Sequence, residues 1–293
     1  MKVLVIGGTG NVGSRVATGL AGKGVKTVVL SRTAEKFRAL PSGVEGLVAD
    51  LGDPGSLARA CEGMDGVFLL VAVNPNETRQ GIAAVQAAKT AGVKKIVYLS
   101  VYMPEGSTHI PHFASKLPVE NAVKDSGIVY TILRPNNFFQ NDLRIKDALL
   151  AYGIYMLPLG QAGLNRVDIR DIADCAVNAL TRPGFEGRTW PVHGPEALTG
   201  REIAKTYSRH LGRAVRYGGD DLDAWEAQVR NVMPERQVRD LRVMYKFFQD
   251  HGTVASVRDL EEQQKILGQT PRLFDDFVKE AVANWTLEVP RAA

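Results

Sequence analysis

The sequence predicts an α/β fold with a doubly wound parallel sheet, and three observations lead to that prediction. Short apolar segments alternate with segments of helical spacing through the first half of the chain. One apolar segment, residues 66–71, is continuous, as expected for a parallel strand that is buried on both faces. A glycine-rich turn joins the first apolar segment to the first helical one. Right-handed crossover connections would then place helices on both faces of one sheet.

The glycine-rich turn follows the strand at residues 1–6 and has the sequence GGTGNVG at positions 7–13. Gly8, Gly10 and Gly13 give the spacing G-x-G-x-x-G. Glycines in this context allow a tight turn, the close approach of a pyrophosphate and close packing of helix on strand. The residues expected beside the phosphates are Gly7, Thr9, Gly10, Asn11, Val12 and Gly13. The alternative is a tight turn that binds no ligand.

The composition is that of an ordinary globular protein. Of the 293 residues, 45% are hydrophobic and 23% are charged, and the net charge is only +4. The basic residues are scattered, so nucleic acid is not favoured as a partner. Cys61 and Cys175 do not make a disulfide framework, and no metal site is expected. The first residues form a core strand instead of a signal peptide and no apolar run could span a bilayer, so we expect a cytoplasmic protein with no membrane partner.

The second strand, residues 25–30, ends at the position that distinguishes the two nicotinamide dinucleotides. An acidic residue about 20 positions after the glycines would bind the ribose 2′-hydroxyl of NAD. Ser31 and Arg32 occupy this place, and Lys36 follows. No carboxylate would repel a 2′-phosphate here, and two cations are available to hold it, so we expect NADP(H). Arg32 and Lys36 could instead be solvated residues at a helix start.

Four more core strands are expected, at residues 44–49, 66–71, 95–100 and 128–133. The first of them ends at Asp50 and Leu51, beside the adenine in this type of fold, although Asp50 could equally cap the next helix. The strand at 66–71 ends in small apolar residues that would leave room for a cofactor. These residues are Val71, Ala72 and Val73.

Polar residues follow the last two core strands. Ser100 ends the strand at 95–100, and the next helix carries His112, Lys116 and Glu120 at intervals of four. The three side chains of this helix would therefore share one face. The residues that leave the carboxyl edge of the sheet after the strand at 128–133 are Pro135, Asn136, Asn137, Phe138 and Phe139. Ligands bind at this edge in such sheets, so the two phenylalanines could form apolar walls for a planar substrate, or could pack the joint between two domains.

With these residues the chain resembles the NmrA-like group of atypical short-chain dehydrogenases/reductases. The resemblance covers nearly the whole chain. It is carried by residues 7–13, by Ser31-Arg32, by the helix from His112 to Glu120, by Tyr130 to Pro135 and by Val167 to Asp171. It implies a Rossmann-type core that binds NADP(H). The group includes NAD(P)H-dependent quinone oxidoreductases, isoflavone-reductase-like enzymes and catalytically silent regulators that sense NADP.

One position departs from the superfamily pattern Tyr-x-x-x-Lys, in which tyrosine donates a proton and lysine holds the nicotinamide ribose. Lys116 stands at the lysine position, but His112 stands at the tyrosine position. The resemblance implies that Lys116 keeps its role at the ribose and that any proton comes from elsewhere. His112 is a candidate general acid because an imidazole titrates near neutrality. The alternatives are a half-exposed His112 and a solvated Lys116 without a role. Nearby, Tyr98 is expected to pack in the sheet, whereas Tyr102 could face the pocket.

The C-terminal half is mainly helical and is expected to form a smaller, substrate-binding part. Residues 1–135, joined by 164–195, would form the NADP-binding core, and residues 136–163 and 196–293 the smaller part. Expected elements are helices at 141–151, from 167, from 199, at 222–232, at 234–248 and at 273–285, with a strand or extended edge at 153–160 and a short strand at 188–192. Thr199 and Glu202 predict a capping box. The tail from Glu288 to Ala293 is expected to be loose.

The sequence therefore predicts an NADPH-dependent oxidoreductase that transfers hydride to a quinone or a similar conjugated carbonyl. Such a planar apolar acceptor tolerates the missing tyrosine, because the phenolate formed can take its proton from water. The missing tyrosine also keeps a second function open, a catalytically silent NADP(H) sensor that acts on a protein partner. An epimerase or dehydratase of nucleotide sugars fits less well, since those enzymes keep the tyrosine. We expect a monomer or a homodimer.

Overall fold

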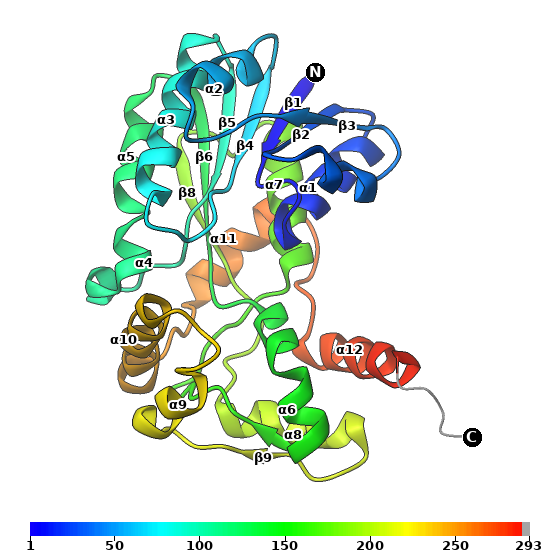
Figure 1. Cartoon of the computed structure of the whole chain (residues 1–293), viewed down its shortest axis with the longest axis vertical. Helices are drawn as coiled ribbons and strands as arrows, with labels where there is room; N and C mark the ends of the chain where they lie inside the picture. Colours follow the sequence, from blue (N-terminus) through cyan, green and yellow to red (C-terminus); the bar gives the residue numbers. More distant parts are fainter. Residues whose placement is uncertain (289–293) are drawn as a thin grey trace. The chain divides into compact units, whose positions relative to one another are not determined.

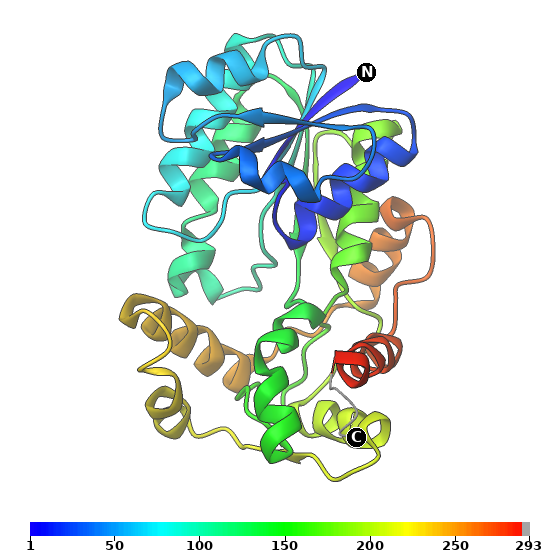
Figure 2. The same ribbon diagram turned by 45° about the vertical axis from the view of Figure 1, so that its right-hand side comes forward.

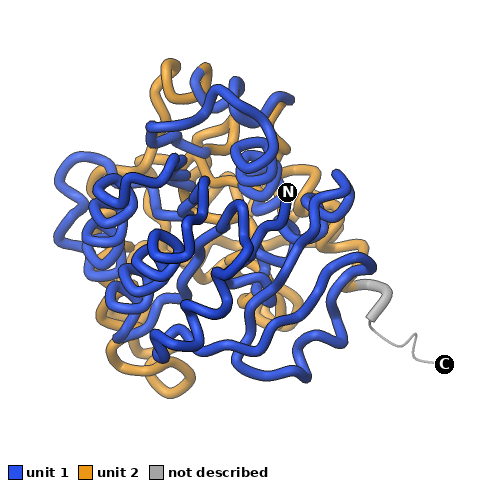
Figure 3. The backbone as a smooth tube through the Cα atoms, turned by 90° about the horizontal axis from the view of Figure 1, so that it is seen from above, with its two compact units in different colours: residues 1–135, 169–192, 262–269 blue, residues 136–168, 193–261, 270–293 orange. Residues whose placement is uncertain are grey.

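The computed structural model describes residues 1–288 (Figure 1). The chain forms two compact units, which Figure 3 shows in separate colours. Unit 1 comprises residues 1–135, 169–192 and 262–269, and unit 2 comprises residues 136–168, 193–261 and those from 270 onward. The expected loose tail begins at the last residue of the final helix, and its other residues, 289–293, lie outside the described part of the chain.

A seven-stranded parallel sheet forms the centre of unit 1. Its order is β3-β2-β1-β4-β5-β6-β8, and every neighbouring pair is parallel. The strands are β1 (Lys2–Ile6), β2 (Lys26–Ser31), β3 (Val44–Val48), β4 (Gly66–Leu69), β5 (Lys95–Leu99), β6 (Val129–Pro135) and β8 (Arg188–Val192). This arrangement confirms the predicted doubly wound sheet. The strand order reverses between β1 and β4, and a ligand in such a sheet binds outside the carboxyl ends of those strands.

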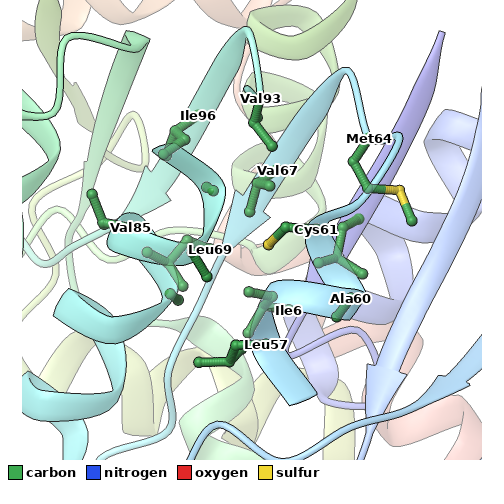
Figure 4. Close-up of a cluster of buried hydrophobic side chains, with 14 of the residues drawn as sticks. Ile6, Leu57, Ala60, Cys61, Met64, Val67, Leu69, Val85, Val93 and Ile96 are labelled. Carbon is green, nitrogen blue, oxygen red and sulfur yellow. The ribbon is translucent and has the colours of Figure 1, made fainter. Parts of the chain in front are cut away.

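Three helices cover one face of the sheet: α2 (Pro54–Cys61), α3 (Glu77–Thr90) and α5 (Leu117–Asp125). Their buried side chains pack against alternate residues of the strands, as the two-residue period of a strand requires. Figure 4 shows part of this cluster, with Leu57 and Cys61 of α2 against Ile6, Val67 and Leu69 of the strands. The cluster holds the carboxyl ends of β1 and β4 in a fixed register.

The other two large helices of unit 1 are α1 (Asn11–Gly22) and α7 (Ile169–Thr181), which lie side by side in Figures 1 and 2. A Cβ at Gly19 of α1 would lie 2.9 Å from the side chain of Val177, so a glycine there allows the close contact. Helix α7 also packs on β4, β5 and β6. Helices α1 and α7 therefore form one layer on the sheet of unit 1.

The end of α11 (Val257–Leu267) also packs in unit 1, although the sequence placed residues 262–269 with the smaller part. The side-chain amide of Asn178 in α7 donates hydrogen bonds to the carbonyls of Ile266 and Leu267, at 3.0 and 3.1 Å. These carbonyls lie in the last turn of α11, where no helical N–H reaches them. Asn178 thus fixes the end of α11, a contact that its spacing in the sequence does not reveal.

Unit 2 is mainly helical, as the sequence predicts. Its described elements are η3 (Phe139–Ile145), α6 (Lys146–Tyr152), α8 (Gly200–Leu211), α9 (Leu222–Val229), α10 (Glu235–His251), α12 (Phe274–Glu288) and a two-stranded sheet of β7 (Ile154–Tyr155) and β9 (Arg216–Tyr217). The segment 153–160, expected as a strand or an extended edge, pairs as a strand only at Ile154–Tyr155. Pro158 has no N–H to donate to a strand ladder, and Gly160 has a φ of +78°, so the extended pairing ends early.

The predicted capping box at the start of α8 is confirmed. The Thr199 hydroxyl accepts a hydrogen bond from the backbone N–H of Glu202 at 3.3 Å, and the Glu202 carboxylate accepts one from the N–H of Thr199 at 2.8 Å. Two N–H groups at the helix start are satisfied in this way.

Two further observations concern what the fold does not contain. None of the helices within residues 1–288 is long and apolar enough to cross a membrane. In the same described part of the chain, no group of three or more His, Cys, Asp or Glu side chains could hold a metal ion.

Candidate cofactor and active site

The glycine turn between β1 and α1 is compact because glycine is required at three of its positions. Gly7 has a φ of +81°, and its carbonyl accepts the N–H of Gly10 at 3.0 Å. A Cβ at Gly13 would lie 2.2 Å from the Gly7 oxygen, and one at Gly8 would lie 2.7 Å from the side chain of Val29. Real side chains cannot approach so closely, so these glycines fix the turn and bring α1 against the sheet.

Gly10 differs from its neighbours, because a Cβ there would meet a single atom, the Gly7 oxygen at 3.3 Å. Gly10 is exposed and stands at the N-cap of α1, whose first turn has no acidic residue and whose cap makes no side-chain hydrogen bond. The first N–H groups of a helix have no acceptor within the helix and carry partial positive charge. The turn therefore fits a pyrophosphate, with Thr9 and Asn11 exposed beside it and buried Val12 able to offer only its backbone.

The end of β2 carries the residues expected at a 2′-phosphate. Ser31 is buried, and its hydroxyl accepts a hydrogen bond from the N–H of Thr33 at 3.3 Å. Arg32 and Lys36 are exposed, and neither forms an ion pair with another described residue. Lys36 lies in the short helix η1 (Ala34–Ala39). Both cations are thus available to an anion at this corner of the sheet.

The structure excludes one of the two interpretations of Asp50, namely that it caps helix α2. Helix α2 is capped by Asp53, whose carboxylate accepts the N–H of Gly55 at 3.0 Å. Asp50 is exposed and instead accepts the N–H of Gly52 at 2.8 Å, while Leu51 is partly buried against the core. The cap is therefore not the role of Asp50, and a contact with the adenine stays a prediction.

The turn after β4 lies next to the glycine turn, since β1 and β4 are neighbours. Val71 is buried, whereas Ala72 is exposed and 59% of the Val73 surface is exposed. The side-chain amide of Asn74 donates to the Ala72 carbonyl at 2.7 Å and so shapes this turn. Two exposed apolar residues, Ala72 and Val73, therefore stand at the reversal point of the sheet, and the room for a cofactor beside them stays a prediction.

A buried ionic cluster stands at the ends of β5 and β6. The Ser100 hydroxyl donates to Oε1 of Glu120 at 2.6 Å. The Arg134 guanidinium donates to both oxygens of the same carboxylate, at 2.9 and 2.7 Å. Burial alone would raise the pKa of the Glu120 carboxyl, but the hydrogen bonds from Arg134 and Ser100 outweigh it and lower the pKa. Glu120 is thus ionised, and it uses the one proton that Ser100 can donate.

Lys116 is buried in a second ion pair. Its ammonium lies 2.5 Å from Oε1 of Glu77 in the first turn of α3, with 8% of the lysine side chain and 2% of the glutamate side chain exposed. The hydroxyl of Ser115 donates to the other oxygen of Glu77 at 3.0 Å. The solvated alternative for Lys116 is therefore wrong. Glu77 was not singled out in the sequence, where an acidic residue in a first helical turn looks like an ordinary partner of the helix dipole.

The helix that was expected to carry His112, Lys116 and Glu120 on one face is interrupted. It consists of α4 (Pro111–Ala114), a turn at 115–116, and α5. Pro118 has no N–H to donate to the carbonyl of Ala114, so the regular ladder stops there. Lys116 and Glu120 are buried, whereas His112 is half-buried, with its ring edge-on to Phe113 at 4.8 Å.

The two tyrosines near this site are placed differently. Tyr98 is buried in β5, which confirms that it packs in the sheet, and burial together with the Glu77 and Glu120 carboxylates raises the pKa of its hydroxyl. Its hydroxyl therefore stays protonated and is a weaker acid than an exposed tyrosine. Tyr102 is half-buried after β5, and its N–H donates to the Pro135 carbonyl at 2.8 Å.

The predicted residues after β6 belong to unit 2 and are held by its own contacts. The side chain of Asn136 is buried and donates to the Thr253 carbonyl at 2.8 Å. The side-chain oxygen of Asn137 accepts a hydrogen bond from Nε of Arg166 at 3.0 Å. The Phe138 carbonyl accepts one from the same guanidinium at 2.7 Å. Phe138 is half-buried, whereas Phe139 is buried and contacts the rings of Phe274 and Phe277. Of the two phenylalanines, Phe139 thus packs the interior of unit 2.

The sheet order, the glycine turn after β1 and the cations after β2 define a Rossmann-type dinucleotide-binding fold. A family model described as the NmrA-like family matches residues 1–277, and the chain belongs to this family.

Known relatives and structures agree with this assignment. The chain is 35% identical to an NAD(P)H azoreductase of Xenophilus azovorans over 285 residues, which cover 96% of this chain and 98% of the relative. A solved NADPH-dependent quinone oxidoreductase of Escherichia coli, complexed with NADPH, matches 98% of this chain and 100% of its own with 25% identity and a TM-score of 0.85. The triphenylmethane reductase of a Citrobacter species covers 97% of this chain and 100% of its own, with 25% identity and a TM-score of 0.86.

Proposed function

We propose that this protein is an NADPH-dependent oxidoreductase that reduces planar conjugated acceptors, with quinones as the leading class. The observation that carries the proposal is the pairing of a glycine cradle that leaves Gly10 open with an exposed, unpaired Arg32 at the end of β2. A cradle and a cation at these places suit a dinucleotide with an extra phosphate.

The acceptor class is supported by what the named relatives share. The relatives are an azoreductase, a quinone oxidoreductase and a reductase of triphenylmethane dyes, and azo compounds, quinones and these dyes all contain conjugated π systems. Small and apolar residues after β4, in particular Ala72 and Val73, provide a surface for such a molecule beside the glycine turn.

Each group in the proposed site has a distinct part in the reaction. Bound NADPH would supply a hydride, and the acceptor would take one further proton from water or from a loosely placed donor such as His112. Backbone N–H groups at the start of α1 would bind the pyrophosphate, Arg32 and Lys36 the 2′-phosphate, and Lys116 a ribose hydroxyl. Ser100 accepts hydrogen bonds more readily than it donates, because Glu120 takes its proton.

The test is NADPH consumption by the pure protein against a panel of quinones, azo dyes and enones. We expect turnover with at least one class, a loss of about tenfold or more in Lys116→Ala, and a shift of preference from NADPH towards NADH in Arg32→Glu. Lys26→Glu is the matched control for Arg32, since it makes the same charge change at the opposite end of the same strand. It should leave the preference for NADPH unchanged.

The outcomes separate the two functions that the sequence leaves open. Turnover that depends on Lys116 and Arg32 supports the reductase. Tight NADPH binding without turnover against the whole panel would overturn it and favour an NADP(H) sensor, for which the missing tyrosine at position 112 is the motivating observation.

A further inference from the structure

We propose that Glu77 is a positioning residue for the active site, which holds the ammonium of Lys116 in place for the cofactor ribose. The inference rests on the reductase proposed above. It adds to the site a residue of the β4–β5 connection, whereas Lys116 lies in the β5–β6 connection. Lys116 comes after β5, whereas Glu77 comes after β4, and these two strands are neighbours. The carboxylate and the ammonium therefore meet at the carboxyl edge, where two crossover connections run side by side.

Three contacts join the start of α3 to the turn at 115–116. The Lys116 ammonium lies 2.5 Å from one Glu77 oxygen, and the Ser115 hydroxyl donates to the other at 3.0 Å. The Thr78 hydroxyl donates to the Ser115 carbonyl at 2.7 Å. Both oxygens of the Glu77 carboxylate thus contact the turn at 115–116. Thr78, the next residue of α3, binds the backbone of the same turn.

The distance between the two helices is also fixed. A Cβ at Gly81, one turn beyond Glu77, would lie 2.7 Å from the side chain of Val119 in α5. Only a glycine allows α3 to lie so close to α5, which begins directly after Lys116. The spacing that brings carboxylate and ammonium together is therefore set by backbone packing, and the ion pair does not have to hold the helices by itself.

A buried ion pair is a weak source of stability, because the desolvation of both charges opposes their attraction. A lysine side chain is also flexible, so a free ammonium at this position would sample many rotamers. The Glu77 carboxylate restricts those rotamers, and an ammonium has three N–H donors, of which Glu77 uses one. The others stay available for ribose hydroxyls, so the pair suits orientation better than stability.

The neighbouring carboxylate makes a useful comparison. Glu120 is also buried, but it has its own guanidinium, Arg134, and a second cation, Lys124, at 3.5 Å. Lys116 is the cation that pairs with Glu77 within residues 1–288. Glu77 therefore has Lys116 as its cation, whereas Glu120 is held by Arg134, Lys124 and Ser100.

The experiment is a double-mutant cycle on Glu77→Gln and Lys116→Met, read by the Kd of NADPH and by kcat and KM for the cofactor. We expect Glu77→Gln to weaken NADPH binding by about tenfold in the wild-type background, and to have no further effect when Lys116 is already Met. Glu77→Asp keeps the charge but shortens the side chain, and should give an intermediate loss. Glu186→Gln removes the partner of Lys95 at the amino end of β5, and is the control that should leave the Kd unchanged.

Thermal unfolding separates positioning from a general loss of structure. Lys116→Met leaves a buried carboxylate without its cation and should lower the Tm, and adding Glu77→Gln should restore part of it. Equal losses of NADPH affinity from Glu77→Gln in both backgrounds would overturn the inference, as would an unchanged Kd in Glu77→Gln. If the wild-type protein itself bound no NADPH, the proposed function would fail instead, so the two failures are distinguishable.

Discussion

Gly13 is the single residue on which the geometry of the cofactor turn depends most directly. Its missing side chain leaves room for the Gly7 carbonyl, which a Cβ would approach to 2.2 Å. The atom concerned is backbone, so it cannot rotate away as a side chain would. The turn and the first helix must move apart if this position carries any other residue.

Gly13→Ala should therefore lower the free energy of unfolding by about 1–3 kcal/mol and abolish NADPH binding. Gly22→Ala in the same helix is the control, since no heavy atom lies within 4 Å of the place that its new methyl group would take and alanine favours a helix. Isothermal titration with NADPH and urea unfolding measure the two effects. Wild-type affinity in Gly13→Ala would contradict the role assigned to this turn.

At this scale the sequence predicts which polar residues stand at the ends of strands, but not the partners of these residues. Ser100 and Asn136 could be identified as residues of the sheet edge because each directly follows a strand, and the carboxyl ends of parallel strands meet at one edge; their contacts with a cofactor stay a prediction. Glu77 could not, because its importance depends on which crossover connections become neighbours in space. The same is true of Arg166, a fully buried guanidinium that binds both oxygens of Asp142 at 3.1 and 2.7 Å.

The elements show where local signals suffice. The capping box of α8 is a local signal, and the structure reproduces it. The break between α4 and α5 was also encoded locally, by Pro118, but the four-residue spacing of polar side chains outweighed it in the prediction. The segment 153–160 forms a strand only at Ile154–Tyr155, which pair with β9, because Pro158 and the positive φ of Gly160 do not suit a longer ladder.

Thr199→Ala tests the capping box as a property of α8 alone. We expect a loss of about 1 kcal/mol in the free energy of unfolding, because two N–H groups at the helix start lose their acceptors or their orientation. Thr206→Ala, in the interior of the same helix, should be neutral or slightly stabilising, since alanine has the higher helix propensity. If the two substitutions lowered the free energy of unfolding equally in chemical denaturation, the interpretation of Thr199 as a helix cap would be wrong.

On the scale of the whole molecule, a buried polar network joins segments of unit 2 that are far apart in the sequence. The side-chain amide of Asn136 donates to Nδ1 of His193 at 3.2 Å and to the Thr253 carbonyl at 2.8 Å. The Asn136 oxygen accepts the backbone N–H of Asn137 and the Thr253 hydroxyl, both at 2.8 Å, and the N–H, which can only donate, fixes the orientation of the amide. His193 is fully buried and must accept at Nδ1, so the network requires a neutral imidazole.

This network predicts how stability depends on pH. Burial lowers the pKa of His193 from 6.5 to about 4, against the weaker opposing effect of the Asp259 carboxylate. Above pH 6.5 neither folded nor unfolded chain protonates this residue. As the pH falls from 6.5 to 4, the unfolded chain takes up the proton first, so folding stability is lost, by at most about 3 kcal/mol.

Urea unfolding of the wild type and of His193→Gln, measured at several pH values, checks this expectation. The variant should be less stable than the wild type at pH 7.5, and the difference between the two should shrink as the pH falls towards 4. His251→Gln, at an exposed position, is the control and should follow the wild-type curve. A constant difference between wild type and His193→Gln over the whole range would show that His193 does not titrate on unfolding.

Unit 1 consists of three segments that are far apart in the sequence and are therefore translated one after another, with other residues between them. Strand β8 and helix α7 are translated after residues 136–168, and residues 262–269, whose carbonyls receive Asn178, come later still. When the glycine turn, Arg32 and Lys116 have left the ribosome, the edge strand β8 and the end of α11 have not yet been synthesised. Unit 1 is incomplete without these two segments. Until then the side of β6 that pairs with β8 is an open strand edge, prone to pairing with other chains. The nascent protein thus carries the glycine turn on a sheet that still lacks its edge strand β8.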